Sequence, residues 1–136
     1  MSVVVQTAPR RHLSERQAEA VDHLVDAAAI EVASCGYDAL SMRGIAKRAG
    51  VATATAYTYF SSKDHVLGEL LLRRVLAIPE PPADPAADVA TRLGRVVDDL
   101  GAITTGGPEV VAACTQALLS SNPDVKRLRD RIGVEV

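Results

Sequence analysis

Apolar residues recur at helical spacing in several separate stretches of this chain. In the first stretch the apolar positions are Val21, Leu24, Val25, Ala28, Ala29, Val32 and Ala33. Their spacing places the side chains on one face of a helix. Ser14 and Gln17 can form a capping box at the start of this helix, and a glycine such as Gly36 commonly ends one. The pattern predicts a long first helix with one buried face.

Two shorter helices are predicted between residues 41 and 60. Ser41 can cap the first of them, whose inward face is expected to be Met42, Ile45, Ala46 and Ala49. Gly50 is expected to end it, because glycine enters the left-handed backbone region without penalty. Residues 53–60 are predicted to form the next helix, although their β-branched and aromatic side chains give low helix propensity. Packing against the core must therefore hold this helix in place.

The rest of the sequence predicts a linker and further helices. Ser61 or Ser62 can cap a fourth helix that begins near Lys63. Prolines at positions 79, 81, 82 and 85 predict an extended linker. Beyond the linker, a helix is predicted over residues 86–104, with an apolar stripe at Val89, Leu93, Val96, Val97 and Leu100. Two more helices are predicted to begin at Pro108 and Asp124. No stretch has the pattern of a strand, so the sequence predicts an all-α fold.

The charge is unevenly distributed, although the formal net charge is only −2. Residues 37–77 carry six basic and three acidic side chains, whereas the segments on either side carry more acidic than basic groups. A local excess of positive charge is what a phosphate-binding surface needs. An excess of this size supports such a surface only weakly.

Residues 41–60 have the layout of two helices that cross at a tight turn. The small Ala46 lets the helices approach and Gly50 supplies the turn, but an ordinary helical hairpin that binds nothing needs the same features. The outward residues favour DNA binding, because Thr53, Ala54 and Thr55 are small enough to enter a major groove about 12 Å wide. Arg43 is long enough to reach a guanine or a phosphate, the alternative being a solvated surface charge.

Aromatic and basic residues follow these small ones. Tyr57 and Tyr59 can each pack an apolar ring and donate the hydroxyl to a phosphate, and for Tyr59 plain core packing is an equal alternative. Lys63 lies in the first turn of the fourth helix, where the positive end of the helix dipole disfavours a lysine. A bound phosphate facing Lys63 would resolve that conflict.

The runs 36–51 (GYDALSMRGIAKRAGV) and 57–63 (YTYFSSK) closely resemble the TetR family of bacterial transcriptional repressors over about residues 18–78. The resemblance implies a three-helix DNA-binding module joined through helix four to a helical regulatory domain. It also implies a homodimer that binds palindromic, double-stranded operator DNA, and a small-molecule inducer whose binding releases the DNA.

The family's DNA contacts are carried over to matching positions of this sequence. The resemblance implies base contacts for Arg43 and Thr53, a groove-facing position for Ala54, and phosphate contacts for Thr55, Tyr57, Tyr59 and Lys63. Ala52 departs from the family, which commonly has a serine or threonine there to cap the third helix. Either Thr53 takes over the cap or this helix end frays.

The resemblance also sets expectations for domain organisation. We expect a disordered tail over 1–13, the DNA-binding domain over 14–78 with its motif at 41–60, a proline-rich linker over 79–85, and a partial regulatory and dimerisation domain over 86–136. This last part is shorter than in the family and looks truncated, which puts the dimer in doubt. The alternative function is therefore a shortened helical interaction protein that no longer represses and pairs with an intact relative.

Other classes of protein are not favoured. Cys35 and Cys114 are expected to be buried apolar groups, and His12, His23 and His65 are expected at the surface. No nucleophile, carboxylate pair or phosphate loop accompanies them, so we expect neither an enzyme nor a cofactor or metal. No segment is apolar enough to cross a membrane, which needs about 20 such residues, and a cytoplasmic location is expected.

Overall fold

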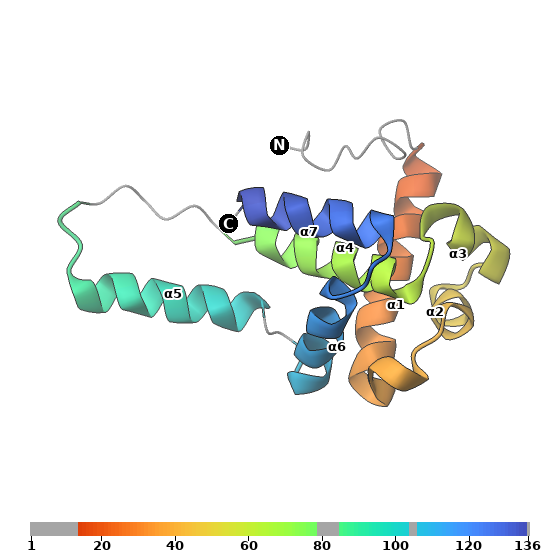
Figure 1. Ribbon diagram of the computed structural model, residues 1–136, viewed down its shortest axis with the longest axis horizontal. Coiled ribbons are helices and arrows are strands. Elements are labelled where there is room, and N and C mark those ends of the chain that lie inside the picture. Colours follow the sequence, from red (N-terminus) through yellow and green to blue (C-terminus); the bar gives the residue numbers. More distant parts are fainter. Residues whose placement is uncertain (1–13, 79–84, 104–105, 136) are drawn as a thin grey trace.

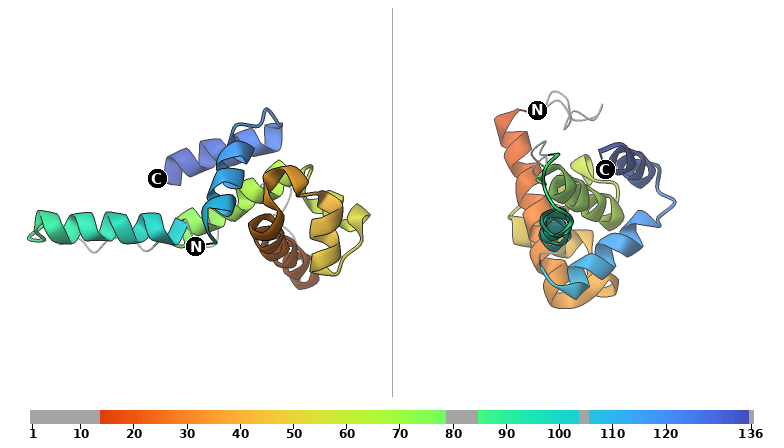
Figure 2. Two further views of the ribbon diagram at one scale, coloured as in Figure 1. Left: turned by 90° about the horizontal axis from the view of Figure 1, so that it is seen from below. Right: turned by 90° about the vertical axis from the view of Figure 1, so that its left-hand side faces the viewer.

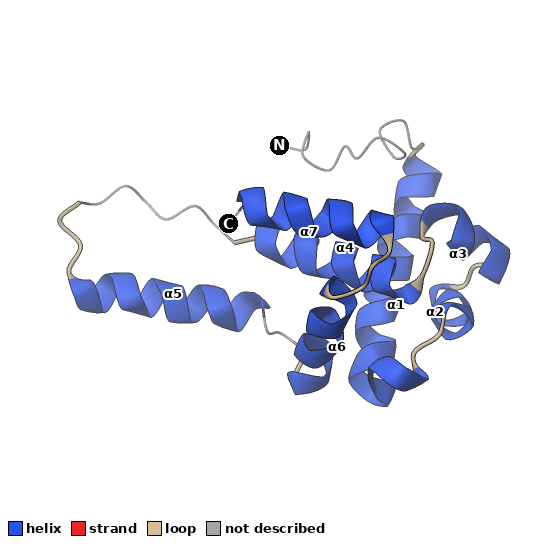
Figure 3. Cartoon of the chain, viewed as in Figure 1, coloured by secondary structure: helices blue, strands red, loops and turns tan. Residues whose placement is uncertain are grey.

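The structure, a computed structural model, describes residues 14–78, 85–103 and 106–135. These residues form seven helices and no strand (Figures 1 and 3), so the predicted all-α fold is confirmed. The helices are α1 (Glu15–Ala39), α2 (Met42–Ala49), α3 (Thr53–Tyr59), α4 (Lys63–Leu76), α5 (Val89–Ile103), α6 (Pro108–Leu118) and α7 (Pro123–Glu135). Of the expected linker over 79–85, residues 79–84 lie outside the described residues, as does the tail over 1–13.

The predicted caps at the starts of α1, α2 and α4 are confirmed. Ser14 and Gln17 form the capping box of α1. Helical backbone angles in α1 are interrupted at Gly36, whose φ of 78° is in the left-handed region. Ser41 caps α2 by accepting the Gly44 amide, and Ser62 rather than Ser61 caps α4 by accepting the amide of His65.

A single apolar core lies where α1, α2, α4 and α6 meet. Its largest fully buried side chains include Phe60, Leu24, Ile45 and Leu67. The predicted inward face of α2 is confirmed, since Met42, Ile45 and Ala46 are buried and Ala49 packs against them. The predicted face of α1 differs at two alanines, because Ala27 is buried and Ala33 is exposed.

The two cysteines do not share an environment. Cys114 is buried in α6, as expected, and burial raises the pKa of its thiol to about 11. Cys35 is exposed, so the expectation that it is buried was wrong. It lies immediately before the Gly36 kink, where the apolar stripe of α1 has already ended.

Helix α4 connects the N-terminal helices to the C-terminal ones. It packs against α1 on one side and against α6 and α7 on the other (Figures 1 and 2). A Cβ on Gly68 would lie 2.9 Å from Cδ1 of Leu128, so the missing side chain lets α7 approach closely. Buried Glu69 lies within 3.5 Å of Nε of Arg73, whose guanidinium also donates to Asp22 of α1.

Helix α5 lies apart from the core, at the opposite end of the long axis from α3 (Figure 1). The sequence predicts its apolar stripe, but the structure leaves the stripe exposed: Val89 at 77%, Leu93 at 61%, Val96 at 53%, Val97 at 60% and Leu100 at 56%. Within the described ranges, no helix is both long and apolar enough to cross a membrane.

Candidate nucleic-acid interface

The turn between α2 and α3 is fixed by backbone hydrogen bonds and a small buried residue. Gly50 adopts the left-handed conformation (φ 74°, ψ 27°), and its amide lies within bonding reach of the Ala46 and Lys47 carbonyls. The Val51 amide donates to the Ala46 carbonyl at 3.0 Å, and Ala46 itself is fully buried. A larger side chain at position 46 would force α2 away from its neighbours.

Helix α3 presents one side to the core and the opposite side to solvent. Ala56 is buried and Tyr59 packs partly against the core. Ala54 and Thr58 are exposed, and Tyr57 is 54% exposed. Thr53 and Thr55 are half-buried at the two edges of the exposed side. The residue set expected to contact DNA therefore lies mostly on the outer side of α3, and Tyr59 lies mainly on its inner side.

No side chain caps the start of α3. Ala52 occupies the N-cap position with extended backbone angles, and the helix begins at Thr53. The alternative in which Thr53 takes over the cap is therefore wrong. The hydroxyl of Thr58, at the other end of the helix, donates to the Ala54 carbonyl at 3.1 Å.

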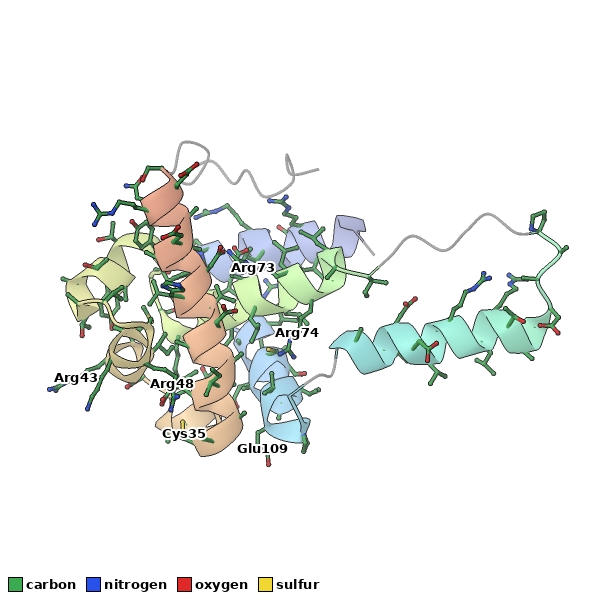
Figure 4. All side chains as sticks on the ribbon, turned by 180° about the vertical axis from the view of Figure 1, so that it is seen from behind. Cys35, Arg43, Arg48, Arg73, Arg74 and Glu109 are labelled. Atoms are coloured by element: carbon green, nitrogen blue, oxygen red, sulfur yellow. The ribbon has the colours of Figure 1, made fainter. Side chains whose placement is uncertain are left out.

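Three exposed cations lie on α2, and two of them share one flank. Arg43 is exposed and projects from the end of the molecule that also carries α3 (Figure 4). Lys47 follows four residues later and is also exposed, so the two side chains share one flank of α2. Arg48 is on another flank, where its Nε lies 2.5 Å from the Glu31 carboxylate of α1. Sequence reasoning singled out Arg43 and missed Lys47, which the helical spacing from Arg43 could have indicated.

Lys63 is bonded within the protein. Its ammonium donates to the carbonyl of Tyr37 at 2.8 Å and to that of Leu40 at 3.1 Å, and lies 4.2 Å from the centre of the Tyr37 ring. These carbonyls follow the Gly36 kink at the end of α1, where the helix dipole is negative. They resolve the conflict between Lys63 and the dipole of α4, so that conflict does not require a phosphate.

Tyr37 completes this contact between α1 and α4. Its hydroxyl donates to the Asp64 carboxylate at 2.5 Å. That hydrogen bond, followed by burial and the negative charge of Asp64, raises the pKa of Tyr37 to about 12. Tyr37 therefore keeps its proton throughout the physiological range and positions the first turn of α4.

A polar cluster joins the start of α4 to the start of α7. The Ser61 hydroxyl donates to the Asp124 carboxylate at 2.8 Å, and Nδ2 of Asn122 lies 3.0 Å from the same hydroxyl. This contact with Ser61 is the first cause that holds the pKa of Asp124 below its usual value. His65 lies edge-on to Phe60 with its Nδ1 3.8 Å from Asp124. The expectation of a surface position was therefore wrong for His65, whose side chain is only 13% exposed.

The described residues do not form a metal-binding cluster. Among them, no group of three or more His, Cys, Asp or Glu side chains is placed to hold an ion. The chemistry that the described surface of α2 and α3 offers is hydrogen bonding by hydroxyls and cations.

Comparisons with known proteins converge on one family. Residues 24–70 match the bacterial regulatory proteins of the tetR family, and this range contains all the residues expected to contact DNA. The uncharacterized HTH-type transcriptional regulator Rv0767c of Mycobacterium tuberculosis is 37% identical over 147 residues, which cover 99% of this chain and 68% of that protein. The HTH-type transcriptional repressor KstR of Mycolicibacterium smegmatis is 32% identical over 123 residues, which cover 88% of this chain and 60% of KstR.

Proposed function

The chain belongs to the tetR family of bacterial regulatory proteins and is a DNA-binding transcriptional regulator, and from this premise we propose that it is a ligand-responsive repressor reading a palindromic operator. The observation that carries the proposal is the outer side of α3. Small or hydroxyl-bearing residues are exposed there, at the end of the molecule from which Arg43 projects. A major groove admits such a helix, and the hydroxyls and the guanidinium supply donors for bases and phosphates.

Each residue in the contact set has a proposed role. Arg43 and Thr53 contact bases, and Ala54 faces the groove, where its methyl group can touch a thymine methyl. The proposed phosphate contacts are Thr55, Tyr57, Tyr59 and Lys63. Exposure supports Tyr57 more strongly than the half-buried Tyr59. Lys63 has two of its three ammonium donors directed at carbonyls, which leaves one donor for a phosphate.

The domain organisation is part of the same proposal. We assign residues 14–78 to the DNA-binding domain, residues 79–85 to the linker, and residues 86–136 to a partial regulatory and dimerisation domain. A homodimer matches the two halves of a palindrome, since each copy reads one half-site. Family membership supports the homodimer and the small-molecule inducer.

The experiment begins with selection of bound sequences from a random double-stranded DNA library, which yields the operator. Operator affinity is then measured at several salt concentrations for the unchanged chain, for Arg43→Ala and for Arg95→Ala. Arg43→Ala is expected to weaken binding by about 10-fold or more, since a good arginine contact to a base contributes about 1–3 kcal/mol. Arg95 lies on α5, far from α3, and its removal is expected to leave affinity unchanged.

Two results would contradict the proposal. One is a selection that enriches no sequence. The other is an Arg43→Ala variant that binds the selected operator with the affinity of the unchanged chain, because a lost arginine contact to a base is expected to cost about 1–3 kcal/mol. An enriched sequence without two-fold symmetry would contradict the proposal of a palindromic operator. It would not contradict the proposed DNA contacts of α2 and α3.

A further inference from the structure

The helix proposed to enter the groove carries no charge of its own. Helix α3 has the sequence TATAYTY, which contains no acidic or basic side chain. The lysines and arginines of residues 24–70 lie on α2 and at the start of α4, and they are Arg43, Lys47, Arg48 and Lys63. Neutralisation of phosphates by such cations supplies essentially all non-specific affinity for DNA. This part of the chain must therefore draw its phosphate contacts by cations from α2 and α4.

Two of these four cations are bonded within the protein. The Lys63 ammonium donates to two backbone carbonyls around the end of α1. Arg48 pairs with Glu31 of α1, since its Nε lies 2.5 Å from the carboxylate. Among the residues that the structure describes, Arg43 and Lys47 have no hydrogen-bond or ion-pair partner. The two fully unpaired cations of residues 24–70 thus both belong to α2.

Helix α2 has three flanks with different surroundings. One flank is buried in the core. A second flank faces Glu31 of α1, whose carboxylate pairs with Arg48 and would lie 3.6 Å from a Cβ on Gly44. The third flank carries Arg43 and Lys47, which are both exposed, and Arg43 projects away from the molecule there (Figure 4). Of the three flanks, this last one is open to a ligand in solvent.

Lys47 lies between Arg43 and the turn that leads to α3. Residues four apart on a helix are neighbours, with Cβ atoms about 5–6 Å apart, so Lys47 is one turn farther along the same flank. Gly50, three residues later, makes the left-handed turn into α3. In a DNA-bound helix-turn-helix the second helix lies in the major groove and the first crosses the backbone. The flank of α2 next to the turn therefore comes close to phosphates.

From this placement we propose that Lys47 is a further DNA contact of this protein and that it binds a phosphate. A lysine ammonium is a compact charge on a flexible stem, which suits a phosphate as a point charge. Such contacts fix the register of a protein on the duplex without reading the sequence. The inference rests on the proposed function, because it needs α3 to lie in a major groove.

A purely structural role for Lys47 makes different predictions. Lys47 lies in the last turn of α2, where a cation is favoured by the helix dipole. A dipole role predicts that loss of the charge lowers stability and leaves the salt dependence of DNA binding unchanged. A phosphate contact predicts unchanged unfolding and a lower salt dependence.

Neutral and charged replacements of Lys47 test the contact. Affinity is measured at several salt concentrations for the selected operator and for an unrelated duplex of the same length. Lys47→Gln is expected to weaken binding to both by a similar factor, and to lower the salt slope by about one for each bound chain. Its deficit is therefore expected to shrink about threefold to fourfold per bound chain between about 50 mM and about 200 mM salt. Lys47→Arg keeps the charge and is expected to keep the slope.

Two controls accompany these variants. Arg95→Gln removes the same charge from α5, far from α3, and is expected to leave the slope unchanged. Arg43→Ala removes a proposed base contact, so it is expected to weaken binding to the operator more than binding to the unrelated duplex. Urea unfolding of Lys47→Gln is expected to match that of the unchanged chain.

Three results would overturn the proposal. The first is an unchanged salt slope for Lys47→Gln on both duplexes. The second is a Lys47→Arg variant that binds as weakly as Lys47→Gln. The third is a deficit of Lys47→Gln that is the same at every salt concentration and comes with a lower urea midpoint, which would assign Lys47 a structural role.

A failure of this proposal differs from a failure of the proposed function. If Lys47 makes no contact, the selection still yields an operator and Arg43→Ala still weakens binding to it. If no sequence is enriched, or Arg43→Ala binds the operator as the unchanged chain does, the proposed function fails instead. The slope on the unrelated duplex tests Lys47 in either case, because a phosphate contact does not depend on sequence.

Discussion

At the scale of single residues, Lys63 shows how a local conflict is resolved by a distant part of the chain. A lysine in the first turn of a helix opposes the helix dipole. Here its ammonium donates to the carbonyls of Tyr37 and Leu40 at the end of another helix, where a positive charge is favourable. The same side chain thus stabilises the junction of α1 with α4.

This position makes Lys63 a stability residue. Lys63→Ala is expected to lower the free energy of unfolding by about 1–3 kcal/mol, because it leaves carbonyls that had a charged donor without one. The measurement is urea denaturation followed by circular dichroism. Lys47→Ala is the control, since Lys47 is exposed and its loss is expected to change stability by less than about 0.5 kcal/mol. Equal stability of the Lys63→Ala variant and the unchanged chain would contradict the structural role.

At the scale of elements, α3 depends on its neighbours for its conformation. It has seven residues, among them β-branched and aromatic ones, and no side chain accepts the amides of its first turn. Buried Ala56 and partly buried Tyr59 attach it to the core. The helix proposed to contact DNA is thus held by packing rather than by its own propensity.

The start of α3 offers a direct test. Ala52→Ser supplies the missing cap, because a serine hydroxyl at this position can accept the amide of Ala54 or Thr55. The variant is expected to gain about 0.5–2 kcal/mol of stability. Ala54→Ser is the matched control, since it adds the same hydroxyl past the N-cap position from which a side chain accepts these amides, and it is expected to give no gain. A gain from Ala54→Ser as large as that from Ala52→Ser would show that capping is not the cause.

The sequence predicts what depends on local chemistry and misses what depends on contacts between distant segments. The capping box at Ser14, the left-handed Gly50 and the inward face of α2 follow from spacing and residue type, and all are confirmed. The partners of Lys63 lie more than 20 residues away, so no local pattern reveals them. His65 is partly covered by its near neighbours Phe60 and Ser61, and the distant Asp124 lies beside it as well. The roles of the DNA-contact residues stay predictions.

At the scale of the whole molecule, α4 belongs to two contact regions at once. In its first turn, Asp64 accepts a hydrogen bond from Tyr37 at the end of α1. Just before this turn, Ser61 donates to Asp124, and Asn122 donates to Ser62. Asn122 also caps α7, because its side-chain oxygen accepts the Asp124 amide at 2.8 Å. A shift of α7 therefore acts directly on the residues that precede α4.

Two substitutions of Asn122 separate these contacts. Asn122→Ala removes the cap of α7 and the donor to Ser61 and Ser62, whereas Asn122→Ser keeps an oxygen for the cap and loses the donor. Amide hydrogen exchange is expected to be faster at the start of α4 in both variants. At the start of α7 it is expected to be faster in Asn122→Ala alone, by about 5-fold for a cap of about 1 kcal/mol. Unchanged exchange around Ser62 in both variants would show that the amide of Asn122 does not couple the two helices.

The exposed stripe of α5 also bears on how the purified protein behaves. Contiguous apolar surface that meets water is a liability for aggregation until a partner covers it. Whatever covers the stripe is therefore expected to raise the solubility of the chain as well as the stability of α5.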